Sequence, residues 1–91
     1  MGMIQRILLK NGLKKLKKEH DRMAGQIRYT NDKEQEKIKK RAIKGILDLQ
    51  VIMVLEKDDG TPYTKEEYEQ MQTEEIIKLF GEIIDETEKM V

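Results

Sequence analysis

The single histidine, His20, is the residue best suited to acid–base or metal chemistry, because imidazole titrates near neutral pH. A zinc or di-iron site would need a second histidine or a Glu-x-x-His pair, and the chain has neither. Serine and cysteine are absent, so the usual nucleophile–histidine arrangements of acyl-transfer enzymes cannot form. The sequence therefore predicts that His20 packs its ring and hydrogen-bonds locally, and that the protein is not an enzyme.

Acidic residues provide two other candidate cation sites. Asp58-Asp59-Gly60 resembles part of a calcium loop, but Leu55 and Lys57 would then occupy positions that must supply oxygen ligands. Carboxylates such as Glu74/Glu75 and Asp85/Glu86/Glu88 form charge runs that are typical of a solvated helix face. The glycines are too far apart to form one phosphate-binding loop. We therefore expect no metal ion and no cofactor.

Basic residues are concentrated in one half of the chain. Residues 1–46 contain fourteen Lys and Arg and five acidic residues, whereas residues 47–91 contain four and thirteen, which gives formal charges of +9 and −9. A basic helical hairpin of this kind could follow a phosphate backbone. Such binding would be mostly electrostatic, because lysine predominates and the two basic helices lack aromatic residues. The predicted nucleic-acid contacts are Lys14, Lys17, Lys18, Lys37, Lys39, Lys40 and Arg41.

The elements that carry these residues are predicted to be three helices, near residues 3–27, 33–56 and 64–90. Apolar side chains recur at alternating spacings of four and three, which is the pattern of an amphipathic helix packed along a neighbour. Asn31 with Glu34, and Thr64 with Glu67, match N-terminal capping patterns. Gly25 or Asn31 could supply a left-handed residue that ends the first helix. One continuous rod is a weaker alternative, because residues 28–37 carry no apolar seam.

Two local features qualify this assignment. The run Val51–Leu55 is rich enough in β-branched residues to form a strand, but helix is favoured because the chain offers no second strand to pair with it. The third helix is expected to kink near Gln72-Thr73. The predicted fold is all-α: one domain over residues 1–91, an elongated antiparallel three-helix bundle or helical hairpin with coiled-coil-like packing and short connections.

The lean apolar content, 37% of residues against 40% charged, predicts that a partner or a second copy adds buried surface. A homodimer is the simplest form. Opposite charges flank the seams of the first and third helices, which is typical of paired helices, and the pairing could lie within one chain or between chains. The predicted oligomer or partner interface consists of Leu9, Leu13, Leu16, Ile76, Phe80 and Ile83.

These observations favour a small cytoplasmic, non-enzymatic protein–protein interaction module, such as a regulator, inhibitor or assembly factor. The alternatives are a nucleic-acid-binding regulator that uses the basic half, and a helix that lies on an anionic membrane surface. The longest apolar run, Val51–Leu55, is too short for a membrane span. In composition alone, the Lys-, Glu- and Ile-rich chain is similar to small accessory proteins of AT-rich bacteria and their phages.

Overall fold

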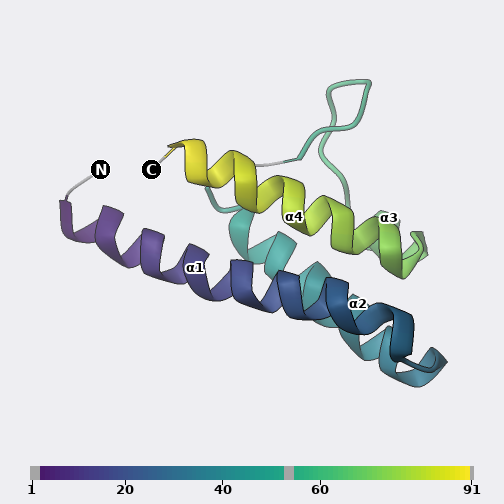
Figure 1. Ribbon diagram of the computed structural model, residues 1–91. Helices are drawn as coiled ribbons and strands as arrows, with labels where there is room; N and C mark the ends of the chain where they lie inside the picture. Colours follow the sequence, from purple (N-terminus) through teal and green to yellow (C-terminus); the bar gives the residue numbers. More distant parts are fainter. Residues whose placement is uncertain (1–2, 53–54, 91) are drawn as a thin grey trace.

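The computed structural model describes residues 3–52 and 55–90, and only the backbone of residues 4–8. Over these ranges the protein is all-α, as predicted. An isolated antiparallel β-bridge joins Glu56 and Pro62. Within the same ranges, no helix is both long and apolar enough to cross a membrane. The elements are α1 (Met3–Gln26), the 3-10 turn η1 (Ile27–Tyr29), α2 (Asp32–Leu49), α3 (Lys65–Gln70) and α4 (Thr73–Met90) (Figure 1).

Helix α4 holds the bundle together, because it packs along both α2 and α1, whereas α1 and α2 contact each other little. α4 is antiparallel to α1, so the ends of the chain lie on the same side of the molecule (Figure 1). It runs in the same general direction as α2, because α3 begins near the end of the molecule where α2 also begins (Figure 1). The bundle measures 43 × 31 × 15 Å.

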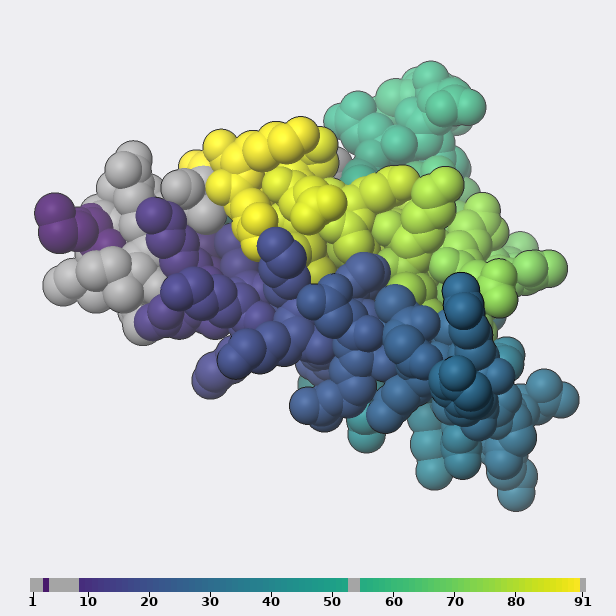
Figure 2. All heavy atoms as spheres, in the orientation of Figure 1, coloured from purple at the N-terminus to yellow at the C-terminus, as the bar shows by residue number. Residues whose placement is uncertain are grey.

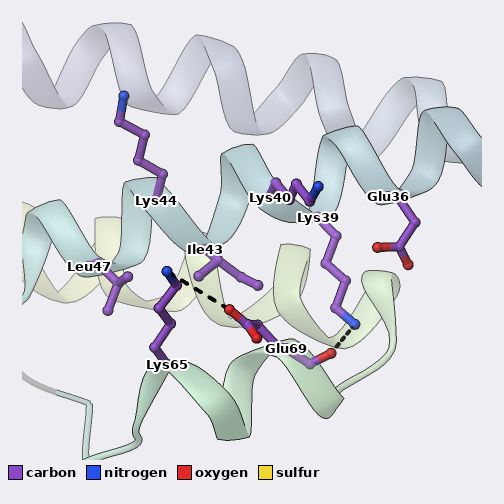
Figure 3. A pocket seen from close by; sticks show the side chains of 8 residues that line it. All are labelled: Glu36, Lys39, Lys40, Ile43, Lys44, Leu47, Lys65 and Glu69. Atoms are coloured by element: carbon purple, nitrogen blue, oxygen red, sulfur yellow. Dashed lines mark hydrogen bonds and ion pairs between the residues drawn. The ribbon is translucent and has the colours of Figure 1, made fainter.

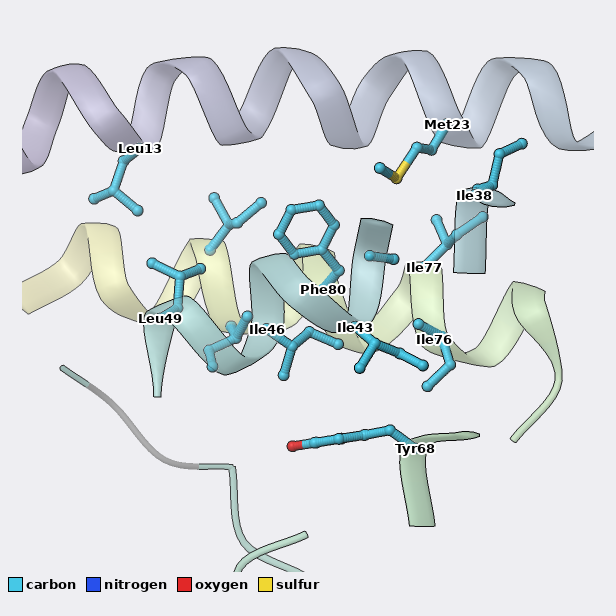
Figure 4. Packing of buried hydrophobic residues seen from close by; sticks show 13 residues of the cluster. Leu13, Met23, Ile38, Ile43, Ile46, Leu49, Tyr68, Ile76, Ile77 and Phe80 are labelled. Carbon is cyan, nitrogen blue, oxygen red and sulfur yellow. The ribbon is translucent and has the colours of Figure 1, made fainter. Parts of the chain in front are cut away.

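The core lies where the apolar faces of α1, α2 and α4 meet (Figure 4). The Phe80 ring is close enough to α2 that a Cβ atom added at Gly45 would lie 2.6 Å from its Cε1. Full burial of each Ile or Phe side chain stabilises the fold by about 1.5–3 kcal/mol before entropic costs. The buried apolar residues are Leu13, Met23, Ile38, Ala42, Ile43, Ile46, Leu49, Tyr68, Ile76, Ile77, Phe80, Ile83 and Ile84.

The connection between α1 and α2 is a tight turn, so the two helices do not form one rod. Asn31 caps α2 as predicted: its backbone is extended, and its side-chain oxygen accepts a hydrogen bond from the Glu34 backbone N–H at 2.9 Å. The prediction that Gly25 or Asn31 ends the first helix in a left-handed conformation was wrong. Among the described residues, Gly60 alone has a positive φ. α1 ends instead through the 3-10 turn η1, whose Ile27 carbonyl accepts from the Thr30 hydroxyl.

The predicted extent of the second helix, to residue 56, was wrong. α2 ends at Leu49, Gln50–Ile52 form a turn, Leu55 is not helical, and residues 53–54 of the apolar run lie outside the described residues. One side-chain hydrogen bond and the types of the following residues favour the turn over another helical turn. The Gln50 amide donates to the Tyr68 hydroxyl at 2.6 Å, and burial of Tyr68 raises its pKa. β-branched residues after Leu49 also lower helix propensity.

Residues 55–63 then form a short hairpin whose tip projects from the helices (Figures 1 and 2), while Leu55 and Tyr63 at its two ends pack against the core. The Lys57 backbone N–H donates to the Thr61 carbonyl at 2.7 Å, and Gly60 takes the left-handed conformation, φ +86°, that the turn requires. Asp59 Oδ1 accepts from both the backbone N–H and the hydroxyl of Thr61, so it serves the turn. The predicted capping box of Thr64 and Glu67 is confirmed, and the predicted kink appears as a break at Met71-Gln72.

Candidate docking site between α2 and α3

Four exposed cations, Lys37, Lys40, Arg41 and Lys44, form a basic ridge along the outer side of α2. Their spacing of three and four residues places them on one face of the helix. The opposite face is buried in the core from Ile38 to Leu49. The amphipathic pattern therefore sets the orientation of α2 and directs this charge into solvent.

The acidic half of the chain does not neutralise the basic ridge. Among the described residues, one side-chain ion pair joins the two halves, between Lys17 and Glu88 at 3.6 Å. The pairs Lys57–Glu67, Lys65–Glu69 and Lys89–Glu86 all lie within the acidic half. Pairs of this kind contribute little to stability, because solvent screens them. The cations of the basic ridge therefore have no ion-pair partner in the acidic half among the described residues.

A groove of about 630 Å³ lies between α2 and α3, next to the basic ridge. Figure 3 shows Ile43 directed from α2 toward α3, with Leu47 one turn further along α2. Lys65 and Glu69 form the opposite wall. The apolar part of the floor is narrow, since Ile43 is 5% exposed and Leu47 is half-buried. The lining residues are Glu36, Lys39, Lys40, Ile43, Lys44, Leu47, Lys65 and Glu69.

Contacts between α2 and α3 hold this groove in shape. The Lys39 ammonium donates to the backbone carbonyl of Glu69 near the end of α3. The Lys65 ammonium lies 4.0 Å from the Glu69 carboxylate (Figure 3). Lys40 and Lys44 line the groove and make no ion pair among the described residues, and the Lys44 side chain is directed away from α3 (Figure 3). The lining carries four lysines and two carboxylates, and an acidic ligand therefore fits it better than a basic one.

The structure separates the cations that the sequence grouped together as nucleic-acid contacts. Lys37, Lys40 and Arg41 share the basic ridge, whereas Lys39 is partly buried against α3. Lys17 lies against α4, in a shallow hollow that it shares with Asp85. Lys14 and Lys18 are exposed on α1 and line neither the groove nor that hollow. Of the predicted contacts, the three exposed ones on α2 therefore share one face, whereas those on α1 do not line the groove.

The six residues predicted as an oligomer or partner interface lie inside the fold of one chain. Leu13, Ile76, Phe80 and Ile83 are buried, and Leu9 and Leu16 are partly buried against the same core. α1 and α4, whose seams these residues form, pack against each other within the chain. We therefore place the candidate partner surface at the groove and the basic ridge.

His20 packs between helices rather than in a reactive pocket. Its Nε2 lies 3.1 Å from the Ile77 carbonyl, which can only accept, so Nε2 carries the proton and donates. The ring meets Phe80 edge-on, with centroids 5.8 Å apart. His20 Nδ1 also lies 3.4 Å from Asp21 Oδ1, the local contact that was predicted, and the bond to α4 adds a partner that the sequence did not indicate. Glycine at position 81 permits this approach, because a Cβ atom there would lie 2.7 Å from Nε2.

Hydrogen bonds within the hairpin and to the start of α3 shift the pKa values of Lys57, Asp59 and Glu67. A hydrogen bond from Lys57 lowers the pKa of Glu67, and the same bond raises the pKa of Lys57. Hydrogen bonds from Thr61 lower the pKa of Asp59. The described residues contain no group of three or more His, Cys, Asp or Glu side chains arranged to hold a metal ion. These ionised groups thus stabilise the hairpin and the start of α3.

Comparisons with protein-family models, with curated proteins and with solved structures found no match for this chain. A function is therefore proposed from the chemistry of the groove and the ridge. Sequence reasoning identified the ridge but missed the groove, because the groove exists only when α3 folds back beside α2. The one local sequence feature of the groove is the i, i+4 spacing of Lys65 and Glu69, which form its α3 wall.

Proposed function

We propose that this protein is a non-enzymatic interaction module that binds an acidic segment of a protein partner in the groove between α2 and α3. The observation that carries the proposal is the combination of an apolar floor, Ile43 and Leu47, with unneutralised lysines at the rim. An acidic amphipathic helix offers the complementary pattern, with apolar side chains for the floor and carboxylates for Lys40 and Lys44. By covering that segment, the protein would regulate or inhibit its partner, or assist the assembly of the partner into a complex.

The charge separation supports this function beyond the groove itself. A surface of one sign steers an oppositely charged partner during encounter and disfavours partners of the same sign. The acidic half of the chain repels other acidic surfaces, so an acidic partner is directed toward the basic face. Absence of serine and cysteine, together with a histidine engaged by the Ile77 carbonyl, supports a binding role over a catalytic one.

The test uses a fluorescently labelled acidic amphipathic peptide, with Leu and Glu at helical spacing, and a scrambled peptide of equal composition. We expect saturable binding of the amphipathic peptide, weakened at least about tenfold in the double variant Lys40→Glu, Lys44→Glu, because two rim charges become repulsive. The matched control is Lys10→Glu with Lys15→Glu, an equal charge change at exposed positions of α1. That control should shift the dissociation constant by less than about threefold.

Two results would contradict the groove proposal. One is equal binding of the amphipathic and scrambled peptides, which would show that only net charge is sensed. The other is equal weakening by the two double variants, which would place binding outside the groove. Circular dichroism of each variant keeps loss of folding separate from loss of binding.

Nucleic acid is the second candidate ligand, and the exposed basic ridge favours it. Lys37, Lys40 and Arg41 are exposed on one face, as a phosphate backbone would require. Titration with duplex DNA, single-stranded DNA and RNA at about 50 and 200 mM salt tests it, because three phosphate contacts predict a loss of about fortyfold over that range and six predict about a thousandfold. No binding at the lower salt concentration would exclude this candidate and leave the protein-partner proposal in place.

A further inference from the structure

A second hollow, of about 430 Å³, lies where the end of α1 meets the first turns of α2. Tyr29 stands at its edge with 87% of its surface exposed, although the rest of the small aromatic complement packs against the core or within it. Lys37 and Arg41 of the basic ridge line the same hollow. The remaining lining residues are Gly25, Gln26, Thr30, Glu34 and Ile38.

The Tyr29 ring is held on a well-defined turn. The Thr30 hydroxyl donates to the Ile27 carbonyl at 3.1 Å, and Asn31 caps α2 through the Glu34 N–H. These bonds fix the residues on both sides of Tyr29, so little backbone ordering remains for a ligand to impose. An exposed phenol ring on a fixed turn presents a flat π surface.

The cations beside the ring lie along one side of α2. Lys33, Lys37 and Arg41 recur every four residues, about 6 Å apart along the helix axis, and all three are exposed. Arg41 also supplies a planar guanidinium, which binds phosphate in two-pronged fashion. A ligand that stacks a flat ring on Tyr29 and carries regularly spaced anions would use the ring and the cations together.

We propose that this hollow binds single-stranded nucleic acid, with one base stacked on Tyr29 and the adjoining phosphates on Lys37 and Arg41. Single strands expose the faces of their bases, whereas a duplex keeps them stacked internally. An acidic peptide would satisfy the cations but would leave the ring without a stacking partner. Glu34, at the hollow's edge, is a hydrogen-bond acceptor for a base amino group. The inference rests on the second candidate function above and assigns its location and strand type.

The test measures anisotropy of labelled oligonucleotides of about 12 residues, a length within the site sizes of single-strand-binding folds. Tyr29→Ala should weaken binding about tenfold or more, and Tyr29→Phe, which keeps the ring, should stay within about twofold of the unmodified protein. Lys37→Gln with Arg41→Gln should weaken binding and reduce the salt slope by about 1.4, because each phosphate contact of a single strand contributes about 0.7. The matched control Lys10→Gln with Lys15→Gln removes the same charge at the far end of α1.

The outcomes separate this inference from the functions proposed above. Binding that is unchanged in Tyr29→Ala but weakened by the Lys37 and Arg41 changes would overturn stacking while keeping electrostatic nucleic-acid binding. Equal weakening of single strands and of a duplex by Tyr29→Ala would also overturn it. Absence of any binding at about 50 mM salt would overturn both the inference and the nucleic-acid candidate, and the peptide experiment on the groove would be unaffected.

Discussion

At the scale of single residues, two glycines set how closely α4 approaches its neighbours. Gly45 lets the Phe80 ring lie against α2, and Gly81 lets His20 reach the α4 backbone. A larger residue at either position would occupy space that another side chain already fills. These glycines act through absence of a Cβ atom within a helix, so their effect is on packing and not on backbone conformation.

Gly45→Ala is expected to destabilise the protein despite the better helix propensity of alanine. The propensity gain of about 0.5–1 kcal/mol is outweighed by overpacking of about 1–3 kcal/mol, because the new Cβ would lie 2.6 Å from Phe80 in a filled core. Urea denaturation measures the difference. Gly12→Ala is the matched control: its Cβ would meet nothing within 4 Å, so the same change there should stabilise. A stabilised Gly45→Ala variant would contradict the close packing.

The Lys57–Glu67 pair predicts a pH dependence with a definite sign. The lowered pKa of Glu67 contributes stability above the unfolded-state value, and this contribution disappears as the pH falls through the folded-state pKa. The raised pKa of Lys57 contributes stability below its unfolded-state value, and this is lost as the pH rises through the folded-state pKa. The pair therefore stabilises the fold across the neutral range and weakens at both extremes.

Lys57→Met should remove this dependence from the pair. The urea midpoint of the variant is expected to be lower at neutral pH, and to fall less than that of the unmodified protein between pH 7 and about pH 3. The difference is small because both partners are partly exposed and solvent screens them. Lys78→Met, on α4 and in no ion pair of the described residues, is the control. Parallel pH profiles of the two variants would refute a role for the pair.

At the scale of elements, the stability of the short helix α3 depends on its N-terminal cap and on its contacts with the rest of the fold. A helix of six residues cannot form alone, because nucleation is unfavourable and few hydrogen bonds repay it. Its stability comes from the Thr64–Glu67 capping box, from buried Tyr68, and from the Lys39 contact at its end. Because α3 forms one wall of the groove, these contacts also determine the proposed binding site.

Thr64→Ala should lower the free energy of unfolding by about 1 kcal/mol and loosen α3 preferentially. Hydrogen exchange of the α3 amides is the direct measurement, with faster exchange expected there than in α4. Thr64→Ser keeps the side-chain acceptor for the Glu67 N–H, so it should leave exchange nearly unchanged. Equal exchange rates in the Ala and Ser variants would show that the cap does not hold α3.

At the scale of the whole molecule, the opposite charges on the two halves predict a salt-sensitive self-association. The apolar seams that would drive a dimer are covered within one chain, whereas the +9 and −9 halves can attract between copies. We expect light scattering to give a mean mass above 10.8 kDa at about 20 mM salt, and close to 10.8 kDa at about 300 mM, where screening is stronger. A dimer mass that persists at the higher salt concentration would instead require an apolar interface.

Features that depend only on residues close together in the chain could be predicted from the sequence by itself. Helical periodicity, the caps at Asn31 and Thr64, and the separation of charge are all set by spacings of three or four residues or by plain composition. The exposure of the α2 cations follows from the same periodicity, since the face opposite a buried stripe must meet solvent. The all-α fold and the basic ridge of the candidate site could therefore be predicted from the sequence.

The end of α2, the direction of α4 and the position of the groove depend instead on contacts between distant residues. The Gln50 side chain, at the end of α2, bonds Tyr68, a residue eighteen positions away, and no local pattern indicates that contact. His20 likewise bonds Ile77 on another helix. The seams of α1 and α4 fit an interface between copies equally well, because periodicity shows which face is apolar but not what covers it. Tertiary packing pairs the seams of α1 and α4 with each other, and it thereby determines which surfaces remain exposed for binding.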